Sequence, residues 1–254
     1  MASGIAIEDA ATPDGTRLVA IGDIHGCLGL LDTLLEAIDA EIAADRPDDW
    51  RILTLGDHTD RGPNSRGVID RLIERSDDPR HLSLCGNHDA GMLSFLTNGD
   101  SHRLFVEFGG LQTAASYGVT LDTSDGARLE ASRQALIDAV PSTHLAFLTG
   151  LRASAGFGDY FFCHAGIRPG IPLDQQARED LIWIRQEFLT CGELHPKLIV
   201  HGHTPADHPE ILRNRINIDT RAYSTSVLTA LVAEGTKKWL LQASEDGVAR
   251  RELA

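Results

Sequence analysis

Short apolar runs and amphipathic stretches alternate along the first half of the chain. Three runs have the length and composition of buried strands: RLVAIG at 17–22, RILTLG at 51–56 and HLSLCG at 81–86. The stretch 27–44 carries apolar residues at helical spacing, namely Leu31, Leu34, Leu35, Ile38 and Ile42. Val68, Ile69, Leu72 and Ile73 indicate a second helix, and 92–96 a short third one. Strands that alternate with helices predict βαβ units and a parallel sheet.

The pattern changes after the third strand. Residues 98–150 are helical in pattern and carry no strand signal, which predicts a helical insert. Strand signals then return in RASAGF, DYFFCHAG and KLIVHGHT, and in the pairs EILRN/RINIDT and SVLTALVAEG/KKWLLQAS. The intervening QQAREDLIWIRQEFL, at 175–189, predicts a helix. We interpret residues 1–254 as a single α/β domain with two packed sheets.

Composition narrows the choice of partners. The 254 residues carry a formal net charge of −14, which argues against nucleic acid or an anionic membrane, because both require a basic face. No apolar run approaches the ~20 residues of a membrane helix, and the N-terminus lacks the pattern of a signal peptide. The four cysteines are scattered without a CxxC pair: Cys27, Cys85, Cys163 and Cys191. We therefore expect reduced thiols in a cytoplasmic protein.

Polar side chains follow five of the predicted strands. The five segments are GDIHG, GDHTDRG, GNHD, CHAG and HGHT, and they present Asp23, His25, Asp57, Asn87, His88, His164, His201 and His203. In open α/β sheets, ligands bind outside the carboxyl ends of the strands, so these side chains can converge on one site. One such motif alone is more often a turn or a helix cap than a ligand.

The five motifs together favour a metal centre over ordinary turns. Gathering several uncompensated polar groups costs roughly 1–3 kcal/mol each in desolvation, whereas a bound cation gives every group a partner. Carboxylate, amide and imidazole ligands without thiolates suit Mn²⁺, Fe²⁺ or Zn²⁺ better than Ca²⁺. Two carboxylates, one amide and three imidazoles exceed what one tetrahedral zinc binds. Two metals ~3.5–4 Å apart, the arrangement that serves phosphoryl displacement, fit better.

In this order, the five motifs resemble those of the metallophosphoesterase superfamily, and the DRG ending resembles its PPP-type serine/threonine protein phosphatases. The resemblance extends from about residue 21 to 220. It implies a two-sheet αββα sandwich that holds two divalent metal ions, with Mn²⁺ favoured over Fe²⁺ or Zn²⁺. It also implies hydrolysis of a phosphoester by a metal-bound hydroxide.

The resemblance assigns roles to individual residues. The first metal would be held by Asp23, His25 and Asp57, and the second by Asp57, Asn87, His164 and His203. His88 resembles the general acid, and Asp60 the carboxylate that orients it. Arg61 resembles one phosphate clamp. Arg185, in LIWIRQEF, resembles the second clamp of bacterial and phage members.

Two substrate classes and one non-enzymatic function remain possible interpretations of the sequence. In symmetrical diadenosine tetraphosphate hydrolases, alanine usually occupies the place of Asp60, so Asp60 favours a protein phosphatase, as does WIRQEF. The expected partner is thus a phosphorylated protein or a small phosphoester, with a nucleotide phosphohydrolase as the alternative. A metal-stabilised binding module is disfavoured, because His88, Asp60 and both arginines are present. The sequence does not indicate an oligomeric state.

Some residues depart from the family pattern or lie outside it. His58 stands where protein phosphatases usually carry an aromatic or aliphatic residue, and we expect it to pack. Arg221 replaces a glycine of the usual IDTGA, and its side chain either points to solvent or reaches the pocket mouth to bind a second anion. We expect Trp183 in the core, Arg168 in a solvated loop and His201 outside the ligand set.

Overall fold

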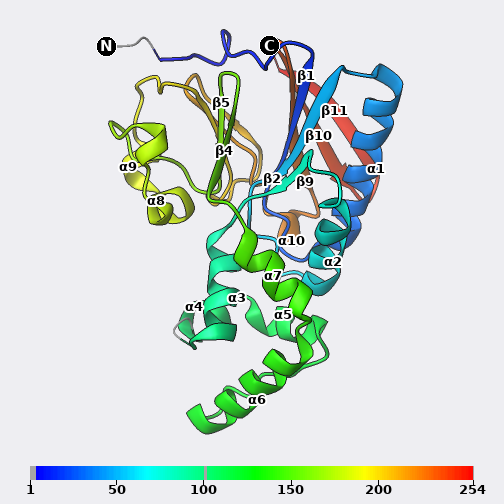
Figure 1. The fold of residues 1–254 in the computed structure, drawn as a ribbon, viewed down its shortest axis with the longest axis vertical. Helices are drawn as coiled ribbons and strands as arrows, with labels where there is room; N and C mark the ends of the chain where they lie inside the picture. Colours follow the sequence, from blue (N-terminus) through cyan, green and yellow to red (C-terminus); the bar gives the residue numbers. More distant parts are fainter. Residues whose placement is uncertain (1–3, 100–101, 254) are drawn as a thin grey trace.

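The computed structural model describes residues 4–99 and 102–253 and contains two mixed sheets with helices on both sides (Figure 1). The first sheet has the strand order β11-β10-β9-β1-β2-β3, and the second β4-β5-β6-β8-β7. The first sheet comprises β1 (Thr16–Ile21), β2 (Asp49–Thr54), β3 (His81–Ser83), β9 (Leu228–Glu234), β10 (Lys237–Ser244) and β11 (Gly247–Leu253). The second comprises β4 (Ser154–Phe157), β5 (Tyr160–Cys163), β6 (Leu198–His201), β7 (Glu210–Ile211) and β8 (Arg215–Asn217). The predicted α/β fold with two sheets is confirmed.

Alternating side chains on β1 show how the layers form. Val19 and Ile21 pack with helix α1 (Leu28–Asp45) on the outer face, while Leu18 and Ala20 pack toward the second sheet. Successive strand residues point to opposite faces, so a strand buried on both sides reads as a continuous apolar run. The outer face of the second sheet is covered by α8 (Arg178–Trp183) and α9 (Gln186–Leu189). The layers therefore run helix, sheet, sheet, helix.

A group of helices lies beyond one end of the sheets, away from the chain ends (Figure 1). These helices are α3 (Asn87–Thr97), α4 (His102–Glu107), α5 (Gly110–Ser116), α6 (Gly126–Ala139) and α7 (Ser142–Gly150). They share an apolar cluster with α2 (Ser65–Arg75) through Ile69. The division into a single domain with an insert at 98–150 stays a prediction. Within the described residues, no helix has the length and apolarity needed to cross a bilayer.

The helix predicted at 175–189 is wrong in its continuity. The structure has a short 3₁₀ turn at Leu173–Gln175, then α8, a break and α9. At the break, Ile184 has ψ 143° and Arg185 has φ −132° and ψ −92°. The apolar residues on both sides of the break still face the sheet. The apolar residues therefore pack on the second sheet as a continuous helix would, while the break in the helix positions Arg185.

The two sheets direct their strand ends to one region. β1, β2 and β3 are parallel, and β5, β6 and β8 are parallel in the other sheet. The polar segments that follow five of these strands therefore leave the sheets on the same side. The short helix α10 (Ala222–Thr225) lies among them, below the strands in Figure 1.

Candidate two-metal site

The structure brings the predicted site residues together around one cavity of about 220 Å³. Eight of them line it: Asp23, His25, Asp57, Arg61, Asn87, His88, Arg185 and His203. The other two contact residues of this lining, because His164 lies 3.3 Å from an Asp57 oxygen and Asp60 lies 2.7 Å from His88 Nδ1. Residues that are up to 180 positions apart in sequence thus meet, as the strand-end rule predicts.

One candidate metal group contains His25, Asp57 and His88. The Nδ1 of His25 lies 2.8 Å from the Thr59 carbonyl oxygen, which fixes the ring and directs Nε2 to within 3.5 Å of Asp57 Oδ2. A histidine whose second nitrogen bonds a carbonyl is a common arrangement at metal sites. Asp23 lies on the same cavity wall and accepts the backbone N–H of His203.

The second candidate group contains Asp57, His164 and His203. His164 places Nδ1 3.0 Å from the Leu55 carbonyl oxygen and Nε2 3.0 Å from Asn87 Oδ1. The same amide oxygen lies 2.8 Å from His203 Nδ1. Asp57 belongs to both groups, as a carboxylate that bridges two cations would.

The electrostatics of the cavity fit bound cations. Burial, followed by the nearby Asp219 carboxylate, raises the pKa of Asp23 well above its usual range. Burial opposes ionisation of Asp57 as well, but His164 and His88 beside it lower its pKa well below the usual value. Three buried carboxylates lie on one cavity wall, since Asp219 also lines it. Such a cluster is stabilised by positive charge, and its oxygen and nitrogen donors suit divalent ions.

His88, a member of the first candidate group, forms a buried dyad with Asp60. Thr113 donates its hydroxyl to Asp60 Oδ1 at 2.8 Å, and His88 Nδ1 donates to Asp60 Oδ2. Burial alone would lower the pKa of His88, but Asp57 and Asp60 raise it above its usual value. The Nε2 of His88 faces the cavity and accepts a hydrogen bond from Arg61 at 3.1 Å. In this arrangement Nδ1 carries the proton and Nε2 is an acceptor, so Nε2 can take up a second proton at the cavity once Arg61 moves away from it.

The two predicted arginine clamps are held by different contacts. The guanidinium of Arg61 lies over the Tyr223 ring, 4.8 Å from its centroid, and donates to the Tyr223 hydroxyl at 3.0 Å. Arg185 donates to the backbone carbonyl of His203 at 3.2 Å from the break between α8 and α9. Both have N–H groups available at the cavity, where an anionic phosphate would lie.

Backbone strain is concentrated at this site. Positive φ angles occur at five of the ten predicted residues: His25, Asp57, Asp60, Arg61 and His203. Two glycines allow close approach, since a Cβ on Gly86 would lie 2.1 Å from Asp57 Oδ1 and one on Gly202 would lie 2.0 Å from Asp23 Oδ1. Strained residues persist only where the surrounding structure enforces them, and they gather at functional sites.

Sequence reasoning missed several residues of the cavity. Asp219 follows β8 in INIDT and could have been recognised as a sixth polar strand end. Tyr223 contacts Arg61 without lining the cavity itself, and it has no motif of its own. The placement of Trp183 in the core is wrong, because its side chain is 37% exposed and lines the cavity with Phe108, which is 50% exposed. Trp183 ends α8 and Phe108 lies in the turn between α4 and α5, so the positions of both rings depend on tertiary packing.

The structure also shows where His201, Arg168 and Arg221 lie. His201 is buried outside the cavity and accepts from Arg215 at 3.1 Å, so it does not face the metal groups. Arg168 is exposed and pairs with Asp180. The guanidinium of Arg221 pairs with Asp207, and its backbone has φ 55°.

His58 is fully buried, as expected for a packing residue. Its Nδ1 lies 3.0 Å from Asp89 Oδ2, its Nε2 lies 2.7 Å from Thr54 Oγ1, and its ring lies edge-on to Phe147. Asp89 also accepts the backbone N–H groups of His58 and Gly86. This pair joins the segment that carries Asp57 to the start of α3, which carries Asn87 and His88.

Comparisons with known proteins agree with this geometry. An asymmetrical bis(5'-nucleosyl)-tetraphosphatase PrpE from Anoxybacillus flavithermus is 29% identical over 230 residues, which cover 83% of this chain and 88% of that protein. Among solved structures, a cold-active protein tyrosine phosphatase matches with a TM-score of 0.60 at 19% identity, over 97% of this chain and 82% of that one. A protein serine/threonine phosphatase from Saccharomyces cerevisiae matches with a TM-score of 0.54 at 12% identity, over 98% and 86%. At these identities the two structures show a shared fold.

The calcineurin-like phosphoesterase family matches residues 16–227, which is most of the chain. The five motifs and the two candidate metal groups lie inside this range, and the predicted resemblance is confirmed. The chain belongs to the calcineurin-like phosphoesterase family and is a metal-dependent phosphoesterase.

Proposed function

We propose that this protein hydrolyses phosphoric esters and anhydrides at a site that holds two divalent metal ions. The observation that carries this proposal is that Asp57 belongs to both candidate metal groups, while His88 of the first group is held by Asp60. The ligands would be Asp23, His25 and Asp57 for one ion, and Asp57, Asn87, His164 and His203 for the other. Such ions supply a water of lowered pKa and neutralise phosphate charge. We favour Mn²⁺ over Fe²⁺ or Zn²⁺.

The protein side chains would bind and orient the phosphate. Arg61 and Arg185 donate N–H groups to its oxygens, which fixes the phosphorus in line for attack. His88 holds a proton at Nε2 and transfers it to the departing oxygen, a contribution typically worth about 10²–10⁴-fold. Asp60 keeps the imidazole oriented through Nδ1 and favours its protonated form. The contact between Arg61 and His88 gives way to phosphate when substrate binds.

We infer that the substrate is a dinucleoside polyphosphate. The relative from Anoxybacillus flavithermus, which carries the name of a tetraphosphatase, aligns over more than four-fifths of both chains. The exposed rings of Phe108 and Trp183 at the cavity offer apolar surfaces on which a nucleobase can stack. A polyanionic substrate is compatible with a chain of charge −14, because the metals and two arginines reverse the sign locally.

A phosphorylated protein is the second candidate substrate. Asp60 is present where symmetrical tetraphosphatases usually carry alanine, and it makes the dyad with His88. Arg185 supplies the second guanidinium of the protein phosphatase pattern. These two features favour phosphomonoester hydrolysis from a protein side chain, but neither disfavours an asymmetrical cleavage of a tetraphosphate.

A comparison of substrates on one enzyme preparation tests the function. We expect chelated protein to be inactive toward p-nitrophenyl phosphate and to regain activity with Mn²⁺. With metal restored, kcat/KM for bis(adenosyl) tetraphosphate should exceed that for phosphoserine and phosphotyrosine peptides by at least about tenfold. A reversed ratio would transfer the assignment to protein phosphatase. Undiminished turnover by chelated protein would contradict the two-metal mechanism altogether.

A further inference from the structure

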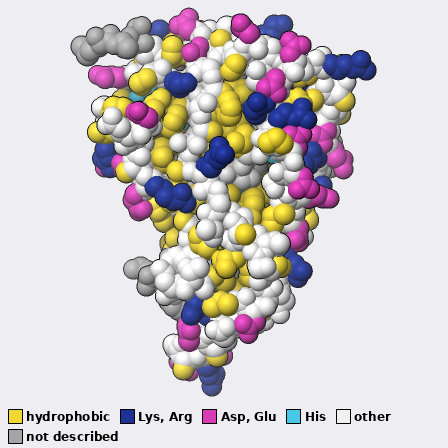
Figure 2. All heavy atoms as spheres, in the orientation of Figure 1, with side chains coloured by type: hydrophobic (Ala, Val, Ile, Leu, Met, Phe, Trp, Pro, Cys, Tyr) yellow, Lys and Arg dark blue, Asp and Glu magenta, His cyan; other side chains and the backbone are white. Residues whose placement is uncertain are grey.

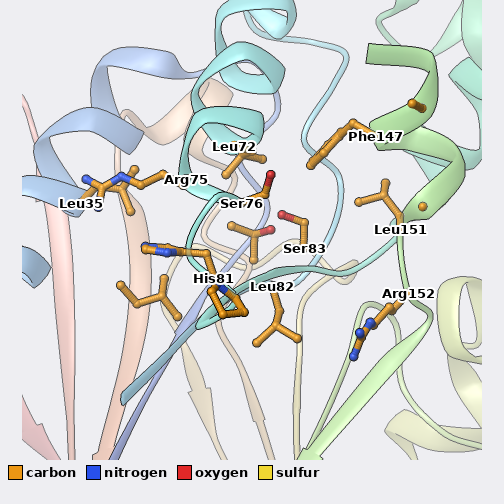
Figure 3. A pocket seen from close by; sticks show the side chains of 15 residues that line it. Leu35, Leu72, Arg75, Ser76, His81, Leu82, Ser83, Phe147, Leu151 and Arg152 are labelled. Carbon is orange, nitrogen blue, oxygen red and sulfur yellow. The ribbon is translucent and has the colours of Figure 1, made fainter. Parts of the chain in front are cut away.

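A second cavity lies away from the two-metal site, between α2, β3 and α7 (Figure 3). Its volume is about 330 Å³, larger than the cavity at the metal groups, and it falls in the range of small-molecule sites. Leu72, Leu82, Phe147 and Leu151 give it apolar walls. The space is thus large enough for a planar ring system with an attached group.

Cationic side chains stand at the rim of this cavity. Arg75 is held by Asp39 through two hydrogen bonds. Arg152 is exposed, and within the described chain its guanidinium makes no hydrogen bond or ion pair. Figure 2 shows basic and acidic side chains intermixed on the face that it draws. An anionic group at the cavity would therefore bind to Arg152, because the Arg75 charge is already paired with Asp39.

His81 contributes the other unusual polar group. Both of its ring nitrogens are buried without a hydrogen-bond partner among the residues that the structure describes. Figure 3 places His81 toward one side of the cavity and Arg152 toward the other, with Ser83 and Leu82 between them. A neutral imidazole offers one donor and one acceptor, which is what the edge of a heterocyclic base also offers. Because both nitrogens are covered in this structure, a ligand with a base at one end and an anion at the other would match both groups once the His81 ring turns toward the cavity.

The cavity is joined to the two-metal site through His58. Thr54 and Phe147 line the cavity, and both contact His58, by a 2.7 Å hydrogen-bond distance and by an edge-on ring contact of 5.9 Å. His58 directly follows Asp57 and is fixed by Asp89 at the start of α3. A ligand that moves Phe147 or Thr54 would therefore displace the segment that carries the bridging carboxylate.

We propose that this cavity is a regulatory site for a mononucleotide, with its phosphate on Arg152 and its base against Phe147 and His81. Occupation of the site changes the rate of phosphoester hydrolysis through Thr54, Phe147 and His58. The choice of a nucleotide among heteroaromatic anions rests on the proposed function, since hydrolysis of a dinucleoside polyphosphate releases mononucleotides.

Binding of AMP to the Mn²⁺-loaded full chain, measured by calorimetry, tests the site. We expect Arg152→Ala to weaken AMP binding about tenfold or more, Arg152→Lys to restore part of it, and the exposed control Arg251→Ala to change nothing. Arg61→Ala should leave this AMP binding intact while it impairs turnover of p-nitrophenyl phosphate. Adenosine and inorganic phosphate, which each carry one half of the ligand, should bind this site at least tenfold more weakly than AMP.

A kinetic measurement completes the test without relying on the tetraphosphate. AMP should alter kcat for p-nitrophenyl phosphate in the native protein and have no such effect in Arg152→Ala, whose turnover without AMP should equal that of the native enzyme. The proposal is wrong if AMP does not bind at millimolar concentration, if Arg152→Ala leaves its affinity unchanged, or if Arg61→Ala abolishes it. Failure of tetraphosphate hydrolysis alone would overturn the proposed substrate and leave the AMP measurements standing.

Discussion

Asp57 and His88 lie side by side in the site, yet their substitution should have different consequences. Asp57→Asn removes the carboxylate common to both donor groups, so we expect loss of metal occupancy together with loss of rate. His88→Asn should keep both metals and lower kcat by about 10²–10⁴-fold for alkyl phosphates. The loss should be smaller for p-nitrophenyl phosphate, because nitrophenolate needs little protonation. Metal content by elemental analysis and kcat for the two leaving groups provide the check.

A uniform loss for good and poor leaving groups in His88→Asn would contradict its role as the acid. Full metal content in Asp57→Asn would contradict the bridging role. Asp219 is also buried in the cavity, so Asp219→Asn provides a matched comparison in which a carboxylate outside both donor groups is neutralised.

Arg221 occupies a left-handed backbone position that glycine adopts without strain. Its φ is 55°, and its backbone N–H donates to Asp219 at 2.9 Å. Arg221→Gly and Arg221→Ala both remove the exposed ion pair with Asp207, so the difference between them reports the backbone. We expect the glycine variant to be more stable than the alanine variant by about 1 kcal/mol, the reverse of the usual order. Urea denaturation of the two variants measures this difference, and equal midpoints would contradict the strain.

At the residue scale, the sequence predicts which polar side chains gather but leaves out those without a motif. The ten predicted residues meet because each follows a strand or starts a helix at a fixed offset. Phe108 lines the cavity from the turn between α4 and α5, and Tyr223 contacts Arg61 from the short helix α10, and both placements depend on packing that no local pattern records. The roles of the gathered residues as ligands, acid and clamps stay predictions.

At the scale of elements, Gly86 links the end of the third strand to α3 at a close contact with the Asp57 segment. A Cβ there would lie 2.1 Å from Asp57 Oδ1 and 2.2 Å from Asp57 N. We therefore expect Gly86→Ala to destabilise the fold by about 1–3 kcal/mol and to reduce metal occupancy, because the Asp57 segment must move. Gly29, in the first turn of α1, has no atom within 4 Å of a built Cβ.

Gly29→Ala is the matched control, and we expect it to raise the free energy of unfolding by up to about 1 kcal/mol. Thermal unfolding and metal content of the two variants separate the effects. If both alanine substitutions behaved alike, the close approach of Gly86 to Asp57 would have no energetic importance.

Strong periodic segments were predicted well at this scale, while breaks and edges were not. The helix at 175–189 is interrupted at Arg185 although its apolar spacing is helical, since tertiary contacts override local preference there. β11 was missed because four of its seven residues are exposed and three of these four are charged, as suits the outer strand of a sheet. The Asp246–Gly247 turn before it was the available signal.

At the scale of the whole molecule, burial of the charge cluster makes folding depend on its cations. Burial lowers the pKa of His164, but Asp57 and Asp23 beside it, with the hydrogen bond to Asp57, together outweigh burial and raise that pKa to about 9. The Asp57–His164 pair therefore stabilises the chelated protein fully below the unfolded pKa of about 6.5 and loses this effect as the pH rises through 9. Burial and Asp219 raise the pKa of Asp23, so ionisation of this carboxyl also lowers the stability of the chelated protein as the pH rises.

Below pH 6.5, buried histidines of lowered pKa make the stability of the chelated protein fall as the pH falls. Burial is the main cause that lowers the pKa of His25 and His201, in each case to about 3, so protonation below pH 6.5 favours unfolding. Chelated protein should therefore be most stable near pH 6.5, and its free energy of unfolding should fall by on the order of 2–3 kcal/mol between pH 6.5 and 9. Mn²⁺-loaded protein should not show this alkaline loss, because bound metal keeps the ligands deprotonated and replaces the imidazolium charge. Denaturant unfolding at pH 6.5 and 9, with and without chelator, measures the difference. A flat profile for the chelated protein, or an equal loss with Mn²⁺ present, would show that the Asp57–His164 pair does not control stability in this range.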